Sequence, residues 1–169
     1  MAMSESGTGF FGLVGRGLRN VARFSGRDAP AQFWPYAGTV FLLSVVVWFI
    51  AMTLSMEGIP DVVGLAVTMA VIAGTVVILL AAAVTRRLHD RGRSGYWGLP
   101  VVIFLTIGLG GTIRIFSGFS AGAAPDSGLG GIIVVNNMIY LVSLALLVVH
   151  LVQRGSQGPN RFGEDPRQT

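Results

Sequence analysis

The side chains best suited to chemistry gather in one stretch, Arg86–Gly98, with the sequence RRLHDRGRSGYWG. It holds four of the twelve basic residues, all of them arginine, and one of the two histidines. Guanidinium groups bind phosphate through paired hydrogen bonds, and a glycine-rich turn before a helix lets backbone N–H groups converge on an anion. We therefore predict a site for an anion or a lipid headgroup, formed by Arg86, Arg87, Arg91, Arg93, Ser94 and Gly95.

A purely structural interpretation of the same stretch stays open. Asp90 follows Arg86 and Arg87 by about one helical turn and is placed to pair with either of them. Ser94 is a suitable cap for the next helix, and Trp97 is a suitable anchor at the membrane surface. In either case we expect a supporting face around the stretch, made by Arg27, Trp34, His89, Asp90, Trp97, Asn160 and Arg161.

Catalysis receives little support from these residues. His89 and Asp90 resemble the pair in metal-dependent HD hydrolases, but such a site needs further ligands, and the only other histidine is His150. Neighbouring residues of a helix also point about 100° apart. A triad of Ser94, His89 and Asp90 in one short loop is sterically awkward and has no identifiable oxyanion hole. Since there is also no cysteine, we predict no catalytic residue, no metal and no cofactor, and the balance favours a protein that is not an enzyme.

Composition indicates a membrane protein. Of 169 residues, 52% are hydrophobic and only 12% are charged, and the mean hydropathy is +0.68; ordinary soluble domains carry roughly a quarter of charged residues. The net charge of +4 comes from arginines that lie almost entirely between apolar runs. This pattern is typical of topology signals and lipid contact, and we expect no nucleic-acid partner.

The apolar runs predict an all-α protein, a four-transmembrane-helix bundle forming a single membrane domain over residues 1–169. A tight turn at Glu57–Asp61 joins the first two spans, and a connection rich in glycine, alanine and serine, Ser117–Gly131, precedes the fourth. Asn136 and Asn137 lie within the fourth span, where asparagines usually bond to a neighbouring helix. The predicted spans are 34–56, 62–84, 96–113 and 132–152.

Both terminal segments carry their own patterns. Over residues 10–24 the apolar side chains project onto one helical face, while Arg16, Arg19 and Arg23 project onto the other. We predict an amphipathic interfacial helix there, with packing on the protein's own helices as the alternative. The polar tail, residues 153–169, is either disordered or folded back on the Arg86–Gly98 stretch through Asn160, Arg161 and Asp165.

The arginines also predict an orientation. Eleven of them precede the first span, lie between the second and third spans, or follow the fourth, and only Arg114 falls on the other side. Positive residues remain in the cytoplasm, so we expect both termini and the Arg86–Gly98 stretch to be cytoplasmic.

Three motifs in this order resemble a known family. They are FSGR at 24–27 with Phe33 and Trp34, RRLHDRGRSGYWG at 86–98, and GPNRFGEDP at 158–166. Together they resemble the YhaH-like family of small bacterial inner-membrane proteins, a domain of unknown function. The resemblance implies a bacterial cytoplasmic membrane protein and supplies no reaction. The family commonly has a second arginine shortly after the first motif, where this chain has Ala29, Pro30 and Ala31; a role shared by two arginines there is thereby put in question.

Function is predicted at the level of the arginine-rich face. The leading hypothesis is a non-enzymatic membrane protein whose cytoplasmic arginines bind anionic phospholipids or a protein partner, which includes a second copy of the chain. A small channel or transporter subunit, with a path lined by Asn136 and Asn137, is the first alternative. An enzyme that holds a lipid phosphate with the same arginines is the second.

Overall fold

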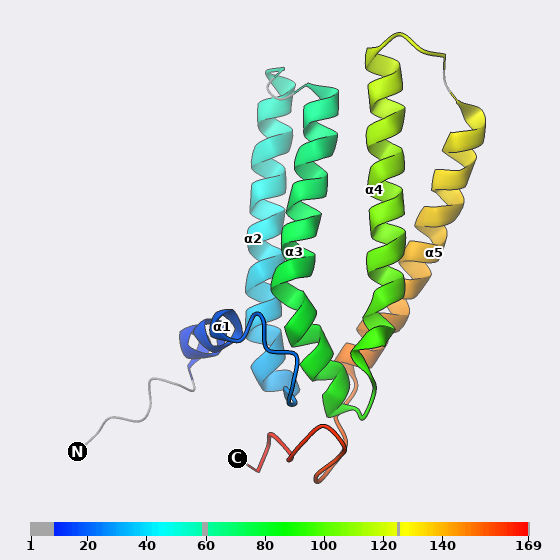
Figure 1. The fold of residues 1–169 in the computed structure, drawn as a ribbon. Coiled ribbons are helices and arrows are strands. Elements are labelled where there is room, and N and C mark those ends of the chain that lie inside the picture. Colours follow the sequence, from blue (N-terminus) through cyan, green and yellow to red (C-terminus); the bar gives the residue numbers. More distant parts are fainter. Residues whose placement is uncertain (1–8, 59–60, 125, 169) are drawn as a thin grey trace. The chain divides into compact units, whose positions relative to one another are not determined.

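The computed structural model describes residues 9–58, 61–124 and 126–168. Their regular structure is helical, with one isolated bridge between Asn160 and Gly163 and no β-strand in these ranges. In chain order the elements are α1 (Phe10–Arg19), α2 (Pro30–Met56), α3 (Val62–Asp90), the 3-10 helix η2 (Gly95–Gly98), α4 (Leu99–Ser120) and α5 (Ser127–Val152) (Figure 1).

Four of these helical runs are long and apolar enough to cross a membrane: α2, α3, Gly95–Ser120 and α5. Each has 26 to 29 residues, which at about 1.5 Å per residue exceeds the roughly 30 Å of a hydrocarbon core. The predictions of an all-α chain and of four candidate spans are therefore confirmed.

Capping residues explain why three of these helices begin where they do. Before α2, the side chain of Gln32 accepts a hydrogen bond from Ala29 N–H (3.2 Å), and Pro30 occupies the first helical position, where its missing N–H costs nothing. Asp61 caps α3 by accepting from Gly64 N–H (2.8 Å), and Asp126 caps α5 by accepting from Leu129 N–H (2.9 Å). Positions 59–60 of the predicted turn lie outside the described residues.

Helix α3 continues beyond the predicted membrane span 62–84. It runs through Asp90, so Arg86 and Arg87 are helical. Gly92 ends it with a left-handed backbone (φ +67°). The N–H groups of Gly92 and Arg93 bond to His89 O (2.9 Å) and Leu88 O (3.0 Å), which is the Schellman pattern of helix termination. Hydropathy marked the end of the apolar run, whereas backbone geometry sets the end of the helix.

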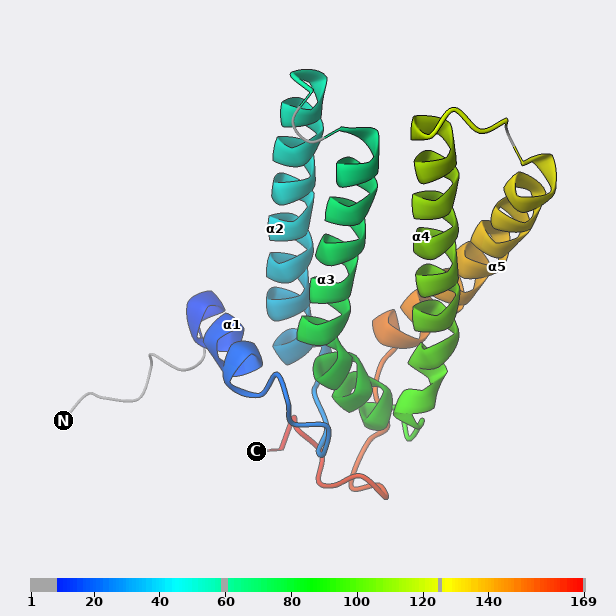
Figure 2. The ribbon, with the colours of Figure 1, turned by 45° about the horizontal axis from the view of Figure 1, so that its top comes forward.

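The chain divides into two compact units, and the first takes in Met1–Leu42, Val76–Gly98 and Leu147–Thr169. Its apolar core includes Tyr36 of α2, which donates to Leu79 O of α3 (2.9 Å). α2 and α3 lie side by side in both ribbon views (Figures 1 and 2). Gly17 of α1 packs on the same tyrosine so closely that a Cβ would lie 2.2 Å from the ring. This glycine therefore permits α1, which ends at Arg19 and not at residue 24, to dock on α2.

The second unit, Leu43–Thr75 and Leu99–Leu146, contains the close contact between α4 and α5. A Cβ at Gly111 would lie 1.9 Å from Ile133 Cδ1, so only glycine fits there. Asn136 is buried and its Nδ2 donates to Phe104 O at 2.9 Å. The structure thus gives this intramembrane asparagine a helix-packing contact, as small and polar residues usually provide within membranes.

Candidate functional site

Asp90, the last residue of α3, is the centre of the most highly connected polar cluster. Its carboxylate accepts from Arg27 Nη2 at 2.9 Å through one oxygen and from Arg87 Nη1 through the other. All three side chains are at most 1% exposed. Arg87 precedes Asp90 by three residues, so both lie on one face of the helix. One buried carboxylate therefore lies between two buried guanidinium groups.

The same two arginines bind the end of α5 and the tail. Arg87 Nε donates to Leu151 O at 2.9 Å, and its Nη2 donates to Gln153 O. Arg27 donates to Ser156 O and Gly158 O, both at 2.8 Å, and to Gly163 O at 3.2 Å. Carbonyls at the end of a helix have no partner within it. Here Arg87 supplies a partner for α5, and together the two arginines hold the last residues of the chain against α3.

A second buried pair joins α3 to the segment between α1 and α2. Arg86 Nε donates to Asp28 Oδ2 at 2.7 Å, and its Nη1 donates to Asn20 O at 2.9 Å and to Arg23 O. The half-exposed Arg16 of α1 donates to the other oxygen of Asp28 at 3.2 Å. Asp28 thus bridges two arginines, as Asp90 does.

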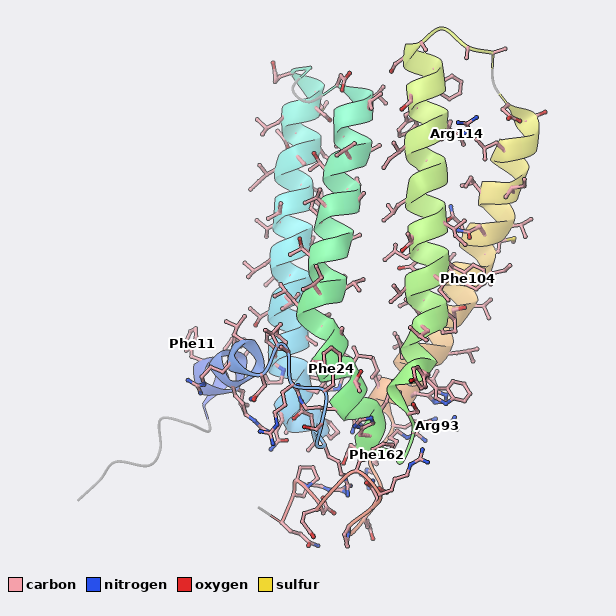
Figure 3. The ribbon with its side chains drawn as sticks, viewed as in Figure 1. Phe11, Phe24, Arg93, Phe104, Arg114 and Phe162 are labelled. Carbon is pink, nitrogen blue, oxygen red and sulfur yellow. The ribbon has the colours of Figure 1, made fainter. Side chains whose placement is uncertain are left out.

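The tail lies against the end of α3 and is not an extended, unbonded segment over its described residues. Asn160 Nδ2 donates to His89 O (3.0 Å), and Arg161 Nη2 donates to Gly92 O (3.1 Å). The Phe162 ring stacks on the His89 ring with centroids 3.8 Å apart, and Figure 3 labels Phe162 beside that helix end. A Cβ at Gly155 would lie 1.9 Å from Asp90 Oδ2, so the chain needs glycine to pass there.

An ion pair within the tail fixes its last turn. Asp165 accepts from Arg167 Nε at 2.7 Å and from Gly158 N–H at 3.0 Å. The hydrogen bond from Arg167 is the main reason why the pKa of the Asp165 carboxyl falls from 3.8 to about 2. This carboxylate stays charged at any physiological pH.

The predicted site residues separate into two groups. Seven of them join one hydrogen-bonded network in the first unit, which we call the buried network after its buried core: Arg27, Arg86, Arg87 and Asp90, with the partly buried His89 and Asn160 and the exposed Arg161 at its edge. Protein acceptors occupy the guanidinium groups of Arg86 and Arg87. Trp34 lies on α2, 40% exposed, with its ring edge-on to that of Phe33. It has no hydrogen bond or ring contact to this network among the described residues.

The other group, Arg91, Arg93 and Trp97, is more accessible. It meets His150, which was not a predicted site residue, and we call these four residues the tryptophan cluster. The Arg93 guanidinium lies 4.6 Å from the centroid of Trp97, whose ring meets that of His150 edge-on at 5.1 Å. Arg91 Nη1 lies 3.2 Å from His150 Nδ1. No carboxylate forms a salt bridge with either arginine over the described residues.

Ser94 and Gly95 shape the turn beside this cluster. Ser94 Oγ accepts a long hydrogen bond from Tyr96 N–H (3.4 Å). Gly95 lies against Thr85, where a Cβ would be 2.7 Å from Cγ2. The glycine therefore serves close packing of the turn on α3. The described residues include no group of three or more histidine, aspartate or glutamate side chains placed to hold a metal ion.

The residues of the buried network lie in the range of a known family. The family model for the protein of unknown function DUF805 matches residues 21–164. The chain belongs to this family. The resemblance inferred from the three motifs is thereby confirmed. No curated protein and no solved structure matches the chain. Arg27, Asp90 and Asn160 all lie within the DUF805 match, so the buried network consists of residues of the family's own domain.

Proposed function

We propose that this DUF805 protein is a non-enzymatic protein of the bacterial cytoplasmic membrane whose surface arginines bind anionic phospholipid headgroups. The observation that carries the proposal is the pairing of charges in the first unit. Arg27, Arg86 and Arg87 are matched by buried carboxylates, whereas Arg93 and Arg154 have no carboxylate partner among the described residues. We therefore assign headgroup binding to Arg93 and Arg154, and no longer to Arg86 and Arg87.

Their position in the helices supports a lipid ligand. Arg93 follows the end of α3, and Arg154 follows the end of α5 by two residues. Helices that cross the hydrocarbon core end among the headgroups, which is also where tryptophans such as Trp97 are enriched. A guanidinium group held there can bind a phosphate through two hydrogen bonds.

Helix α1 supports the same membrane position. Phe10, Phe11 and Leu18 are all more than half exposed, with Phe11 at 87%. Exposed aromatic side chains on a docked helix are stabilised by the acyl region of a bilayer surface. We place α1 in that surface, with Gly17 against α2. With eleven arginines at this end, both termini are cytoplasmic.

The test compares lipid selectivity among single-charge variants. The protein is purified in a neutral detergent, equal amounts of phosphatidylglycerol and phosphatidylcholine are added, and bound lipid is counted by native mass spectrometry. An arginine near an anionic surface contributes roughly 1 kcal/mol, so Arg93→Gln and Arg154→Gln should each reduce the preference for phosphatidylglycerol about fivefold.

Arg114→Gln is the matched control, because it removes the same charge from the last turns of α4. It should leave the preference unchanged. If all three variants keep the wild-type preference, the surface arginines do not select anionic headgroups and the proposal is wrong.

A further inference from the structure

A hollow of about 250 Å³ lies between α1, the segment before α2 and the tail, separate from the tryptophan cluster. Its lining is mostly polar and comes from three parts of the first unit: residues 16–32, Arg86 of α3, and the tail at 162–166. The volume is just below the roughly 300 Å³ at which sites for drug-sized ligands begin, so it suits a small ligand or one group of a larger one.

The charge of the lining favours an anion. Four arginines face two carboxylates, Asp28 and Glu164. Asp90 and Asp28 hold Arg27 and Arg86 in place, so these two form fixed positive walls.

The other two arginines have donors to offer. Arg16 makes a single hydrogen bond, to Asp28, and its side chain is 41% exposed. The Arg23 guanidinium is exposed and has no acceptor in the part of the chain that the structure describes.

The backbone adds further donors without adding acceptors. Gly26 turns the chain with a left-handed φ of +92°. Within the described ranges, the N–H groups of Ser25, Gly26 and Arg27 and the Ser25 hydroxyl have no hydrogen-bond acceptor. The Gly26 carbonyl faces the His89 ring (3.2 Å) and is occupied. Unpaired N–H groups beside two available guanidinium groups are the chemistry that recognises a phosphate oxygen.

We infer that this hollow is a binding site for a phosphate group, contributed either by a soluble phosphate or by a phospholipid headgroup. Arg23 and Arg16 bind the phosphate oxygens, and the Ser25 hydroxyl and the adjacent N–H groups donate further hydrogen bonds to them. The negative charge of Glu164 weakens phosphate binding. The site shares no residue with the proposed headgroup surface at Arg93 and Arg154, so the two can be tested separately.

The first arm uses inorganic phosphate, titrated at constant ionic strength into the full chain in neutral detergent and followed by ³¹P NMR. A hydrogen bond to a charged group is strong enough that Arg23→Gln and Arg16→Gln should each weaken binding about tenfold or more. Ser25→Glu places a carboxylate in the hollow and should abolish binding. Glu164→Gln removes a negative charge from the lining, so it should strengthen phosphate binding about two- to fivefold.

The control is Arg19→Gln, which removes an exposed arginine four residues before Arg23 that does not line the hollow. It should match the wild type. The second arm counts phosphatidylglycerol bound to the same variants by native mass spectrometry.

The site is supported if Arg23→Gln and Ser25→Glu lose binding and Arg19→Gln does not. Loss of inorganic phosphate binding indicates a soluble phosphate as the ligand, and loss of phosphatidylglycerol binding indicates a phospholipid headgroup. If neither arm separates these variants from Arg19→Gln, the inference is wrong. An effect of Arg93→Gln on phosphatidylglycerol alone concerns the other surface and leaves this result unchanged.

Discussion

Asp90 is the carboxylate on which the Arg-rich end of the molecule depends, and Asp90→Asn removes its charge while keeping its shape. The side chain is fully buried between Arg87 and Arg27, which are 0% and 1% exposed. Asparagine has one oxygen to accept a hydrogen bond, and its NH₂ group would face the donors of the second guanidinium. Two buried positive charges would then remain without a counter-charge.

The expected loss is large. Breaking a buried ion pair by removing one partner costs about 3–5 kcal/mol, because the remaining charge is left uncompensated. A folded domain is stable by roughly 5–15 kcal/mol in total. Asp90→Asn should therefore remove a large part of the free energy of unfolding, and it should release the tail, whose carbonyls are held by the same two arginines.

Unfolding in detergent, followed by the fluorescence of Trp34, Trp48 and Trp97, measures this loss. Asp126→Asn makes the same chemical change at an exposed helix cap. Asparagine caps a helix about as well as aspartate, so this control should change the free energy by less than about 0.5 kcal/mol. If Asp90→Asn stays within about 1 kcal/mol of the wild type, the charge of Asp90 does not hold this end together.

Three further predictions address topology, the tail and the membrane asparagine. The chain has no cysteine, so a single cysteine at position 91 should react only with reagents that enter the cytoplasm and one at position 126 only with external reagents; the reverse pattern would invert the topology. The pKa of Asp165 is about 2, below its usual 3.8, so its contribution to tail docking is complete above about pH 4 and is lost as the pH falls toward 2. The protection of the Gly158 amide from hydrogen exchange, taken relative to the intrinsic exchange rate at each pH, should fall over that range in the wild type and should stay constant in Asp165→Asn. Asn136→Leu removes the bond to Phe104 O and should cost about 0.6 kcal/mol by thermal unfolding in detergent; a cost above about 2 kcal/mol would show that the asparagine does more than pack.

The helices were predictable because crossing a membrane is a local property. A run of about 20 apolar residues has to be helical in a bilayer whatever its neighbours are, so hydropathy predicts the four candidate spans. It does not predict where a helix continues beyond the bilayer core. α3 runs six residues past the predicted span, and there Arg86 and Asp90 form ion pairs with residues of another segment. The local pattern signalled the Arg87–Asp90 pair, which lies within one helix, but not these distant partners.

The candidate site was predictable as a set of residues but not as a set of contacts. The three motifs identified Arg27, Asp90 and Asn160, and the structure brings all three together. The pair Arg27–Asp90 spans 63 positions of the chain, and no spacing rule connects such residues. The sequence interpretation missed Asp28, which bridges Arg16 and Arg86. The only signal for Asp28 was its place directly after the FSGR motif. A charged residue just before an apolar run is ordinarily solvated, so this signal did not indicate a buried ion pair.

The buried contacts also explain why the remaining charge is on the surface. In the described part of the first unit, eleven arginines face four carboxylates, and three of these carboxylates, Asp28, Asp90 and Asp165, are buried in ion pairs. Arg27 alone binds the Asp90 carboxylate and three carbonyls of the tail, a geometry that the five donors of a planar guanidinium provide and the three of an ammonium group do not. Folding therefore uses most of the negative charge internally. The surplus positive charge remains on the surface of this unit, at the ends of α3 and α5 and in the terminal segments.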